Sequence, residues 1–323
     1  MIKLTKADKT ILSLIEYNPT ITEKKLAEKC HLSKDSVRYR LRRLEREDVI
    51  KGYSSILDYK KLGYDSYKLY LKLNCTQKQR KEIREFFLKV KNTFSIFESF
   101  GSWDIAIALF AKTPQEFNKI ENEMLNKFGN IIIEKKFCTM IDAQLLENQF
   151  LMDEKTEATK IHKLWGNKKN LELDETNKKL IELLHKNSKE RYVNLSDKVN
   201  LSIDAIKNRL MNIKEIMPLK TTKINYELLG FSKYKAFIYP EKYSDEIEEK
   251  IIEFLVDNDK TINIIRTIGE WKIEVEFLAK KYIDVEKILS ELNEKFSNNI
   301  LKINISTFRK EQILECEKLI FSQ

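Results

Sequence analysis

Hydrophobic and polar residues follow two different periods along this chain, and the first of them is helical. Apolar residues recur every three or four positions in three short segments within residues 9–46, which predicts helices with one buried face. Thr20 and Glu23 have the spacing of a capping box, and Ser33 suits the first position of the third helix. Three helices with a short break before Ser33 predict a helix-turn-helix. We expect the extended stretch 48–58 to be its wing.

The second period is that of strands. Apolar and polar residues alternate over residues 67–73, which predicts a half-buried strand. Further helical and extended segments follow, and Gly101 marks a turn between two extended ones. The predicted order is strand 67–73, helix 76–91, strand 94–100, strand 103–112, helix 113–128 and strand 130–137. This βαββαβ order is that of a ferredoxin-like domain.

The whole pattern occurs twice. The segment FGSWDIAIALFAK (100–112) matches IGEWKIEVEFLAK (268–280) at an offset of 168 residues. The segment LSKDSVRYRL (32–41) matches LSIDAIKNRL (201–210) at an offset of 169. Because the offset changes so little over so long a distance, the matches indicate duplication of one two-domain unit rather than an array of short repeats.

These elements predict an α+β chain with two winged helix-turn-helix domains, each followed by a ferredoxin-like βαββαβ domain. A charged segment without proline separates the two units, and its Trp165 is expected to dock on one of them. The expected boundaries are 1–60 and 61–150 for the first unit, 151–171 for the linker, and 172–226 and 227–323 for the second unit with its C-terminal tail.

Composition narrows the class of protein. Charged residues make up 34% of the chain and the formal net charge is +9, which favours a polyanionic partner such as DNA. With only three histidines and four scattered cysteines, no metal site and no cofactor are expected. No apolar run reaches membrane-spanning length and the start has no secretory core. We therefore expect a cytoplasmic protein with reduced thiols.

The helix expected at 33–46 carries an excess of arginine around an apolar stripe. A face held by ion pairs needs acids at matching spacing, and these are too few here. Arginine suits guanine edges and phosphates, so this face predicts contact with double-stranded DNA in the major groove. The helix holds six bases, Lys34, Arg38, Arg40, Arg42, Arg43 and Arg46, against two acids, Asp35 and Glu45.

At these residues the chain resembles a known family. The segment LAEKCHLSKDSVRYRLRRLEREDVIKGY (26–53) and the βαββαβ half with its GSWD turn (101–104) are similar to the Lrp/AsnC transcription regulators. The resemblance implies that the helix opened by Ser33 is the recognition helix. It implies base contacts by Ser36, Tyr39, Arg40 and Arg43, and contacts nearer the phosphates by Lys34, Arg38 and Arg42. Arg46 completes the expected DNA-binding set.

The resemblance also implies a small-molecule effector, commonly an amino acid. Its site is expected between sensor domains, near the turn from Gly101 to Asp104 and the equivalent turn at Gly269. We assign Trp103 and Trp271 to core packing, as is usual for aromatic strand residues. Typical members have one unit and dimerise. This chain has two units, so a homo-oligomer or a pseudo-dimer within one chain is expected.

The second copy keeps the frame of the helix-turn-helix but loses most of its charge. Arg42 and Arg46 have the equivalents Met211 and Glu215. We therefore expect the second domain to read DNA weakly or to serve a structural or protein-contact role. One departure lies in the first copy, where Asp48 stands at a position at which the family usually has glycine.

The main prediction is a sequence-specific DNA-binding transcription regulator that is not an enzyme and has no catalytic residue. One alternative is an Lrp-like siroheme decarboxylase, which also works as paired units. Such an enzyme needs histidines and arginines in its ferredoxin-like halves to hold a carboxylate-rich tetrapyrrole, and these halves contain no histidine. Another alternative is an architectural DNA-compacting protein without an effector. A footprint on one defined operator would indicate a regulator, whereas uniform coating of DNA would indicate the architectural protein.

Overall fold

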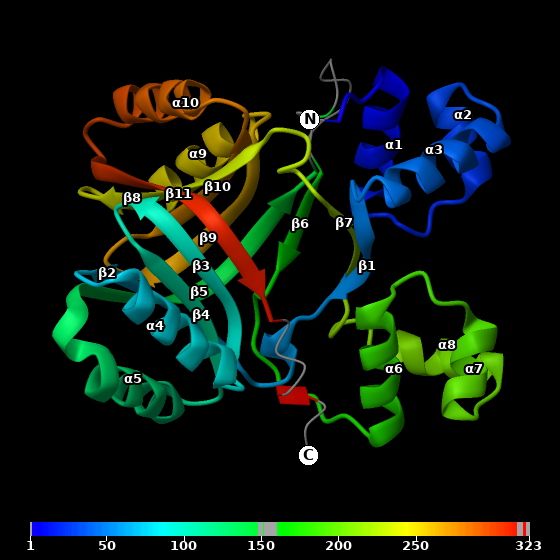
Figure 1. Ribbon diagram of the computed structural model, residues 1–323, viewed down its shortest axis with the longest axis horizontal. Coiled ribbons are helices and arrows are strands. Elements are labelled where there is room, and N and C mark those ends of the chain that lie inside the picture. Colours follow the sequence, from blue (N-terminus) through cyan, green and yellow to red (C-terminus); the bar gives the residue numbers. More distant parts are fainter. Residues whose placement is uncertain (1, 148–150, 152–159, 315–318, 321–323) are drawn as a thin grey trace.

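Two units of the same element order follow one another along the chain and pack together (Figure 1). The structure is a computed structural model that describes residues 2–147, 151, 160–314 and 319–320. The α+β prediction, with a helical domain before each ferredoxin-like domain, is confirmed by this order.

The first helical domain consists of three short helices, each opened by a hydroxyl side chain. The hydroxyls of Thr5, Thr22 and Ser33 each accept a backbone N–H three residues later. The cap of the second helix is therefore Thr22, and the capping box expected at Thr20 is wrong. The helices are α1 (Lys6–Glu16), α2 (Glu23–Cys30) and α3 (Lys34–Arg46).

The second helical domain also consists of three short helices. Its turn before the third helix has the same geometry, because His31 and its equivalent Asn200 both adopt a left-handed backbone with φ 52°. Ser202 caps the third helix as Ser33 does in the first copy. The helices are α6 (Glu175–Lys186), α7 (Tyr192–Val199) and α8 (Ile203–Asn212).

The stretch expected to be a wing is a strand whose partner lies in the other unit. Strand β1 (Ile50–Ile56) pairs antiparallel with β7 (Leu219–Ile224) of the second copy. Asp48 precedes β1 with φ 58°, so it adopts the left-handed conformation for which the family uses glycine. Helix α1 packs on β7 and helix α6 packs on β1, so each helical domain rests on the other's strand.

The ferredoxin-like domains have the predicted order in both units. In the first unit the elements are η1 (Tyr59–Lys61), β2 (Asp65–Leu73), α4 (Gln77–Lys89), β3 (Thr93–Gly101), β4 (Ile105–Ala111), α5 (Pro114–Phe128), η2 (Gly129–Ile131) and β5 (Ile132–Leu146). In the second they are β8 (Ser232–Pro240), α9 (Asp245–Val256), β9 (Thr261–Gly269), β10 (Ile273–Ala279), α10 (Tyr282–Lys295) and β11 (Ile300–Ile313).

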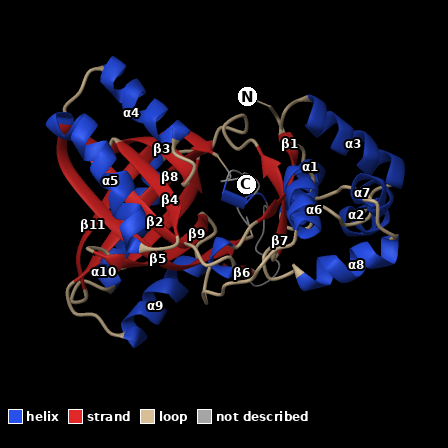
Figure 2. Cartoon of the chain, turned by 90° about the horizontal axis from the view of Figure 1, so that it is seen from below, coloured by secondary structure: helices blue, strands red, loops and turns tan. Residues whose placement is uncertain are grey.

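The two sheets join edge to edge and close. Neighbouring strands follow the order β2-β4-β3-β11-β8-β10-β9-β5, and β5 pairs again with β2. Every pair is antiparallel. Because β5 pairs with β2, these eight strands form one closed barrel. Figure 2 shows this barrel apart from the helical domains, with β1 and β7 between them. One chain therefore builds its own pseudo-dimer.

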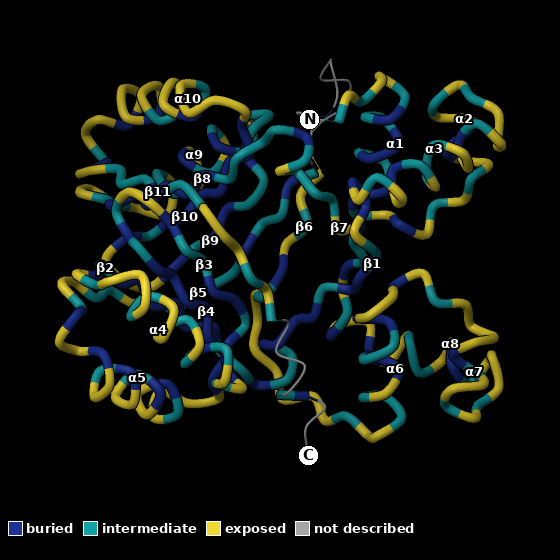
Figure 3. The backbone as a smooth tube through the Cα atoms, viewed as in Figure 1, coloured by how far each residue is buried: buried dark blue, intermediate teal, exposed yellow. Residues whose placement is uncertain are grey.

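Alternating side chains divide the barrel into an outer and an inner layer. Odd-numbered residues of β2 and β10 pack under the outer helices in two separate apolar cores. Even-numbered residues of the same strands, Lys68, Tyr70, Glu274 and Glu276, face the barrel interior. Figure 3 shows the buried strands and the exposed outer faces of the helices.

The described part of the expected linker is integrated into the fold. Strand β6 (Ile161–Leu164) pairs with β5 at the edge of the barrel. Trp165 follows with φ 54°, and its indole N–H donates to the carbonyl oxygen of Leu57 at 2.8 Å. Residues 152–159 lie outside the described part of the chain.

Candidate functional site: the recognition helix and the barrel cavity

Helix α3 buries the stripe that the sequence predicts. Val37 and Leu44 are completely buried and Leu41 is half-buried against α1 and α2. This packing fixes the remaining faces of α3, and those faces carry the bases.

Two of the predicted DNA-binding arginines reach inward to a buried carboxylate. Arg40 Nη1 lies 2.9 Å from Oδ1 of Asp8, and Arg43 Nη2 lies 2.7 Å from Oδ2. Asp8 is fully buried in the first turn of α1, where it also accepts hydrogen bonds from Thr5. Burial alone would raise the pKa of Asp8, but the hydrogen bonds from Thr5, Arg40 and Arg43 outweigh it and lower that pKa to about 2.

The second copy has the same link between its first and third helices. Arg209, the equivalent of Arg40, donates to Asp174 at 2.6 Å and to Asn177 at 3.1 Å. Asp174 and Asn177 occupy the positions of Thr5 and Asp8. Because this contact is present in both copies, it belongs to the fold of the domain, and it holds the third helix on the first.

The other bases of α3 are free to meet a partner. Tyr39 is 63% exposed, and Lys34, Arg42 and Arg46 are exposed as well. None of these four side chains makes a hydrogen bond or ion pair with another residue that the structure describes. Figure 1 shows α3 on the far side of β1 from the barrel.

Arg38 and Ser36 lie between these two groups. Arg38 is exposed and pairs with Glu23 at 2.7 Å and with Asp35 at 3.2 Å. Ser36 is half-buried in the first turn of α3, where its backbone N–H donates to the cap. DNA contact by any of the eight residues, including Arg40 and Arg43, stays a prediction.

Helix α8 presents a different surface at the same place. Ile203 and Met211, at the positions of Lys34 and Arg42, are 37% and 68% exposed. Lys207 is paired with Asp204, and Glu215 with Lys169. The exposed face of α8 also carries Asn208 and Asn212, so its side chains are uncharged or internally neutralised.

The turns expected to hold an effector are packed against strands of the opposite unit. A Cβ on Gly101 would lie 2.6 Å from the carbonyl oxygen of Ile305, and one on Gly269 would lie 2.9 Å from Cβ of Cys138. Asp104 accepts the backbone N–H of Leu73 at 2.9 Å. These residues have structural partners at the seam between the units, and their effector role stays a prediction.

Trp103 and Trp271 are buried inside the barrel, as expected for packing residues. They cluster with Tyr70, Phe237 and Tyr239. The indole N–H of Trp271 donates to Glu274 at 3.1 Å. Together these aromatic side chains fill part of the barrel interior.

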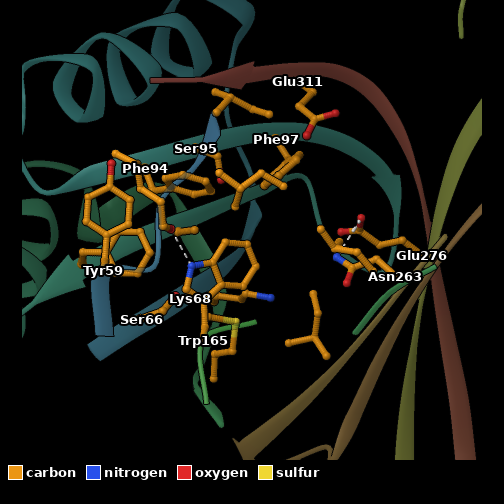
Figure 4. A pocket seen from close by; sticks show the side chains of 18 of the residues that line it. Tyr59, Ser66, Lys68, Phe94, Ser95, Phe97, Trp165, Asn263, Glu276 and Glu311 are labelled. Carbon is orange, nitrogen blue, oxygen red and sulfur yellow. Dashed lines mark hydrogen bonds between the residues drawn. The ribbon is translucent and has the colours of Figure 1, made fainter. Parts of the chain in front are cut away.

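A cavity of about 500 Å³ lies between the barrel interior and the β1–β7 pair, and the sequence analysis missed it. Its residues come from both units: barrel strands, β1, β7, α6 and the former linker. Figure 4 shows Tyr59, Phe94 and Trp165 on one side, with Asn263 and Glu276 on the other. Only closure of the barrel brings these segments together, so no local pattern could have revealed the cavity.

Four charged groups form a buried network beside this cavity. Glu274 lies 2.7 Å from Nζ of Lys68 and 3.2 Å from Nζ of Lys235, which also contacts Glu276 at 2.9 Å. Burial would raise the pKa of Glu274, yet the two lysines hold it well below its usual range. Burial also raises the pKa of Glu276, but Lys235 and Lys233 outweigh it and lower that pKa to about 2. The two lysines and two glutamates of the network carry balancing charges.

Residues 4–51 match a family model described as winged helix-turn-helix DNA-binding. The N-terminal domain is a winged helix-turn-helix. An uncharacterised HTH-type transcriptional regulator of Pyrococcus furiosus is 22% identical over 146 residues, which is 45% of this chain and 95% of that protein. One from Pyrococcus horikoshii is 27% identical over 147 residues, 44% of this chain and 98% of the relative.

One of two similar known structures matches the chain over its full length and shares its fold, and the other matches about half of the chain. The siroheme decarboxylase NirDL has a TM-score of 0.64 with 12% identity, covering 98% of both chains. An AsnC family transcriptional regulator from Agrobacterium tumefaciens covers 48% of this chain at 16% identity and a TM-score of 0.38. The predicted resemblance to regulators, in a doubled form, is confirmed to this extent: both relatives are HTH-type transcriptional regulators that align with less than half of this chain, and the element order occurs twice in it.

Two further features are absent from the described ranges. In the described ranges, no group of three or more histidine, cysteine, aspartate or glutamate side chains is arranged to hold a metal ion. None of the helices in those ranges is long and apolar enough to cross a bilayer.

Proposed function

We propose that this protein is a DNA-binding transcription regulator whose first helix-turn-helix makes the main DNA contact. The observation that carries the proposal is the exposed face of α3, where three bases and a tyrosine have no partner among the residues that the structure describes. Unpaired bases on one helix face repel each other and are stabilised by a polyanion. The HTH-type regulator relatives support the same reading.

The proposed contact set follows from exposure and pairing. Lys34, Arg42 and Arg46 contact phosphates or base edges, and Tyr39 packs against the groove. Arg40 and Arg43 act indirectly, because they hold α3 on α1 through Asp8. We propose that Ser36 and Arg38 make only secondary contacts with DNA, because Ser36 is half-buried and Arg38 is already paired with Glu23 and Asp35.

The second helix-turn-helix is proposed to have a structural role. Its exposed face offers Met211 and Ile203 where the first offers bases, so it lacks the charge for phosphate contact. Its helix α6 supports β1, through the hydroxyls of Ser54 and Ser55, which donate to backbone carbonyls of α6 at 2.6 and 3.1 Å. This support positions the first domain.

The chain provides its own matched variants for a test. Genomic DNA bound by the protein is isolated, and affinity for one fragment is measured by band shift at two salt concentrations. Arg42→Met and Arg46→Glu, which copy Met211 and Glu215 of the second unit, should together weaken binding and flatten its salt dependence. Lys207→Ala should change neither. Equal effects of the two sets of changes would contradict the proposal.

The full-length fold match to a siroheme decarboxylase favours a second candidate function, an enzyme acting on a tetrapyrrole. His185 of α6 lines the cavity, so a histidine is present there although the ferredoxin-like halves have none. The cavity lining contains no arginine, however, and Lys68 and Lys235 are already neutralised. Mixing the protein with siroheme under reducing conditions tests this candidate. A bound-haem absorbance and release of carbon dioxide would favour the enzyme over the regulator.

A further inference from the structure

The cavity under the β1–β7 pair has the size and lining of a ligand site. An apolar cavity of about 150 Å³ is enough for benzene, so about 500 Å³ has room for two or three fused rings. Closed barrels of eight strands commonly hold one small ligand in this way.

One wall of the cavity is aromatic and held in place. Tyr59 stacks on Phe110 with ring centroids 4.3 Å apart, and Phe94 meets both rings edge-on. Trp165 faces them, fixed by its hydrogen bond to the carbonyl oxygen of Leu57. A flat molecule placed between these rings would find aromatic faces prepared for it.

Two polar atoms in the lining have no partner among the described residues. Ser95 is completely buried on β3, and nothing described donates to or accepts from its hydroxyl. Asn263, its equivalent on β9, has a buried amide oxygen without a donor. Buried polar groups are seldom left unpaired, because this costs stability. A hydroxyl or N–H group on a ligand would give these two atoms a hydrogen-bond partner.

The buried lysines and glutamates beside the cavity neutralise one another, so a ligand there needs no charge. Lys68 and Lys235 occur at equivalent positions of the two units, and Glu274 and Glu276 of the second unit together neutralise both. At the positions equivalent to Glu274 and Glu276, the first unit has Ala106 and Ala108, which also line the cavity. These small side chains leave open space where the second unit carries its carboxylates.

We propose that this cavity binds an uncharged, flat aromatic molecule of two or three rings that carries a hydroxyl or N–H group. Resting on the proposed function, the cavity is also the effector site of the regulator. The ligand stacks on the wall of Tyr59, Phe94 and Trp165 and hydrogen-bonds to Ser95 and Asn263.

The route from the cavity to the DNA-binding helix is short. Residues 54–57 of β1 and its continuation line the cavity, and β1 starts four positions after α3 ends. The hydroxyl of Ser54 on β1 donates to the carbonyl oxygen of His185 on α6. Strand β1 is therefore attached to both helical domains, to the first by the chain and to the second by this hydrogen bond. A ligand that favours one placement of β1 shifts the position of α3, and by linkage DNA changes the affinity for the ligand by the same factor.

The test uses three matched probes and the full chain. 2-Naphthol is flat, uncharged at neutral pH and carries a hydroxyl; naphthalene lacks the hydroxyl, and 2-naphthoate carries a negative charge. Binding is measured by saturation-transfer NMR and calorimetry. We expect 2-naphthol to bind more tightly than naphthalene by about three- to tenfold, the worth of one hydrogen bond, and 2-naphthoate to bind weakest.

Variants place the probe in the cavity. Ser95→Ala should lower the affinity for 2-naphthol toward that for naphthalene, and Ala108→Phe should abolish binding of both. Ser99→Ala is the matched control on the same strand, because its hydroxyl donates to the carbonyl oxygen of Trp103 away from the cavity. It should leave binding unchanged. Far-ultraviolet circular dichroism checks that each variant is folded.

The outcomes separate the two proposals. Absence of 2-naphthol binding, or binding that Ser95→Ala and Ala108→Phe leave intact, overturns the cavity site whatever the protein does with DNA. Binding in the cavity without any change in DNA affinity overturns the effector role alone. If the protein binds no DNA, the proposed function fails while the probe measurements still decide the site.

Discussion

Arg40 and Arg42 are two residues apart on α3, yet their side chains have different surroundings in the structure. Alanine substitution of each should therefore have a different effect. Arg40 reaches inward and pairs with buried Asp8, as its equivalent Arg209 does in the second copy. Arg42 is exposed and has no ion pair among the described residues. We predict that Arg40→Ala lowers stability, whereas Arg42→Ala lowers DNA affinity.

The two effects differ in size and in kind. Removing Arg40 leaves Asp8 with Arg43 as its one remaining arginine, and loss of one charged hydrogen bond at a buried group costs about 2 kcal/mol. Removing Arg42 should change the free energy of unfolding by less than about 0.5 kcal/mol. Loss of one phosphate contact should weaken DNA binding about tenfold at low salt and reduce the salt slope by about 1.

Two measurements on the same preparations test this contrast. Urea unfolding followed by circular dichroism gives the free energy of unfolding of each variant. Fluorescence anisotropy with a labelled duplex, titrated at several salt concentrations, gives the affinity and its slope. Arg209→Ala serves as the control, because it removes the same internal contact from the copy that is proposed not to read DNA.

The reasoning fails if Arg40→Ala loses as much DNA affinity as Arg42→Ala at unchanged stability. Arg40 would then contact DNA directly, and its pairing with Asp8 would have to open on binding. Loss of stability on Arg42→Ala would equally contradict the assigned exposure of that side chain.

Three further predictions concern stability, measured by urea unfolding. The pKa of Asp8 is depressed from 3.8 to about 2 in the folded state, so its contribution, about 2.5 kcal/mol, is complete above about pH 5. It should be lost as the pH falls to 2, and Asp8→Asn should remove that dependence. Glu274→Gln should cost about 3 kcal/mol, because Lys68 and Lys235 lose a shared counter-charge; a neutral effect would refute the network. Gly101→Ala should cost about 2 kcal/mol, since φ is 116° and the new Cβ would meet a β11 carbonyl, whereas Gly129→Ala has open space and should be silent.

Local pattern was sufficient for most of the elements. The helical and alternating periods predicted both domain types and their duplication, and the serine cap of α3 was found because an N-cap depends on neighbouring residues alone. The error at Thr20 has the same origin: two threonines two positions apart both suit a cap, and only the backbone path selects Thr22.

The assignment of the arginines shows where local pattern ends. The family resemblance implied base contacts by Arg40 and Arg43, on the same basic helix as Arg42. Whether such a side chain points to solvent depends on what lies across from it, and Asp8 is more than thirty positions away in sequence. The repeat did hold a signal, because Arg40 is matched by Arg209 while Arg42 is matched by Met211.

The sequence by itself determined the periods, the caps, the duplication and the excess of base on one of two equivalent helices, since each depends on the order of nearby residues. Only the tertiary structure decided that the two sheets close into one barrel, that β1 pairs with β7, and that Trp165 covers a cavity between them. These features depend on contacts between distant segments. Such contacts form when unpaired strand edges and apolar faces must be satisfied together, and no local pattern encodes which distant edge will meet them.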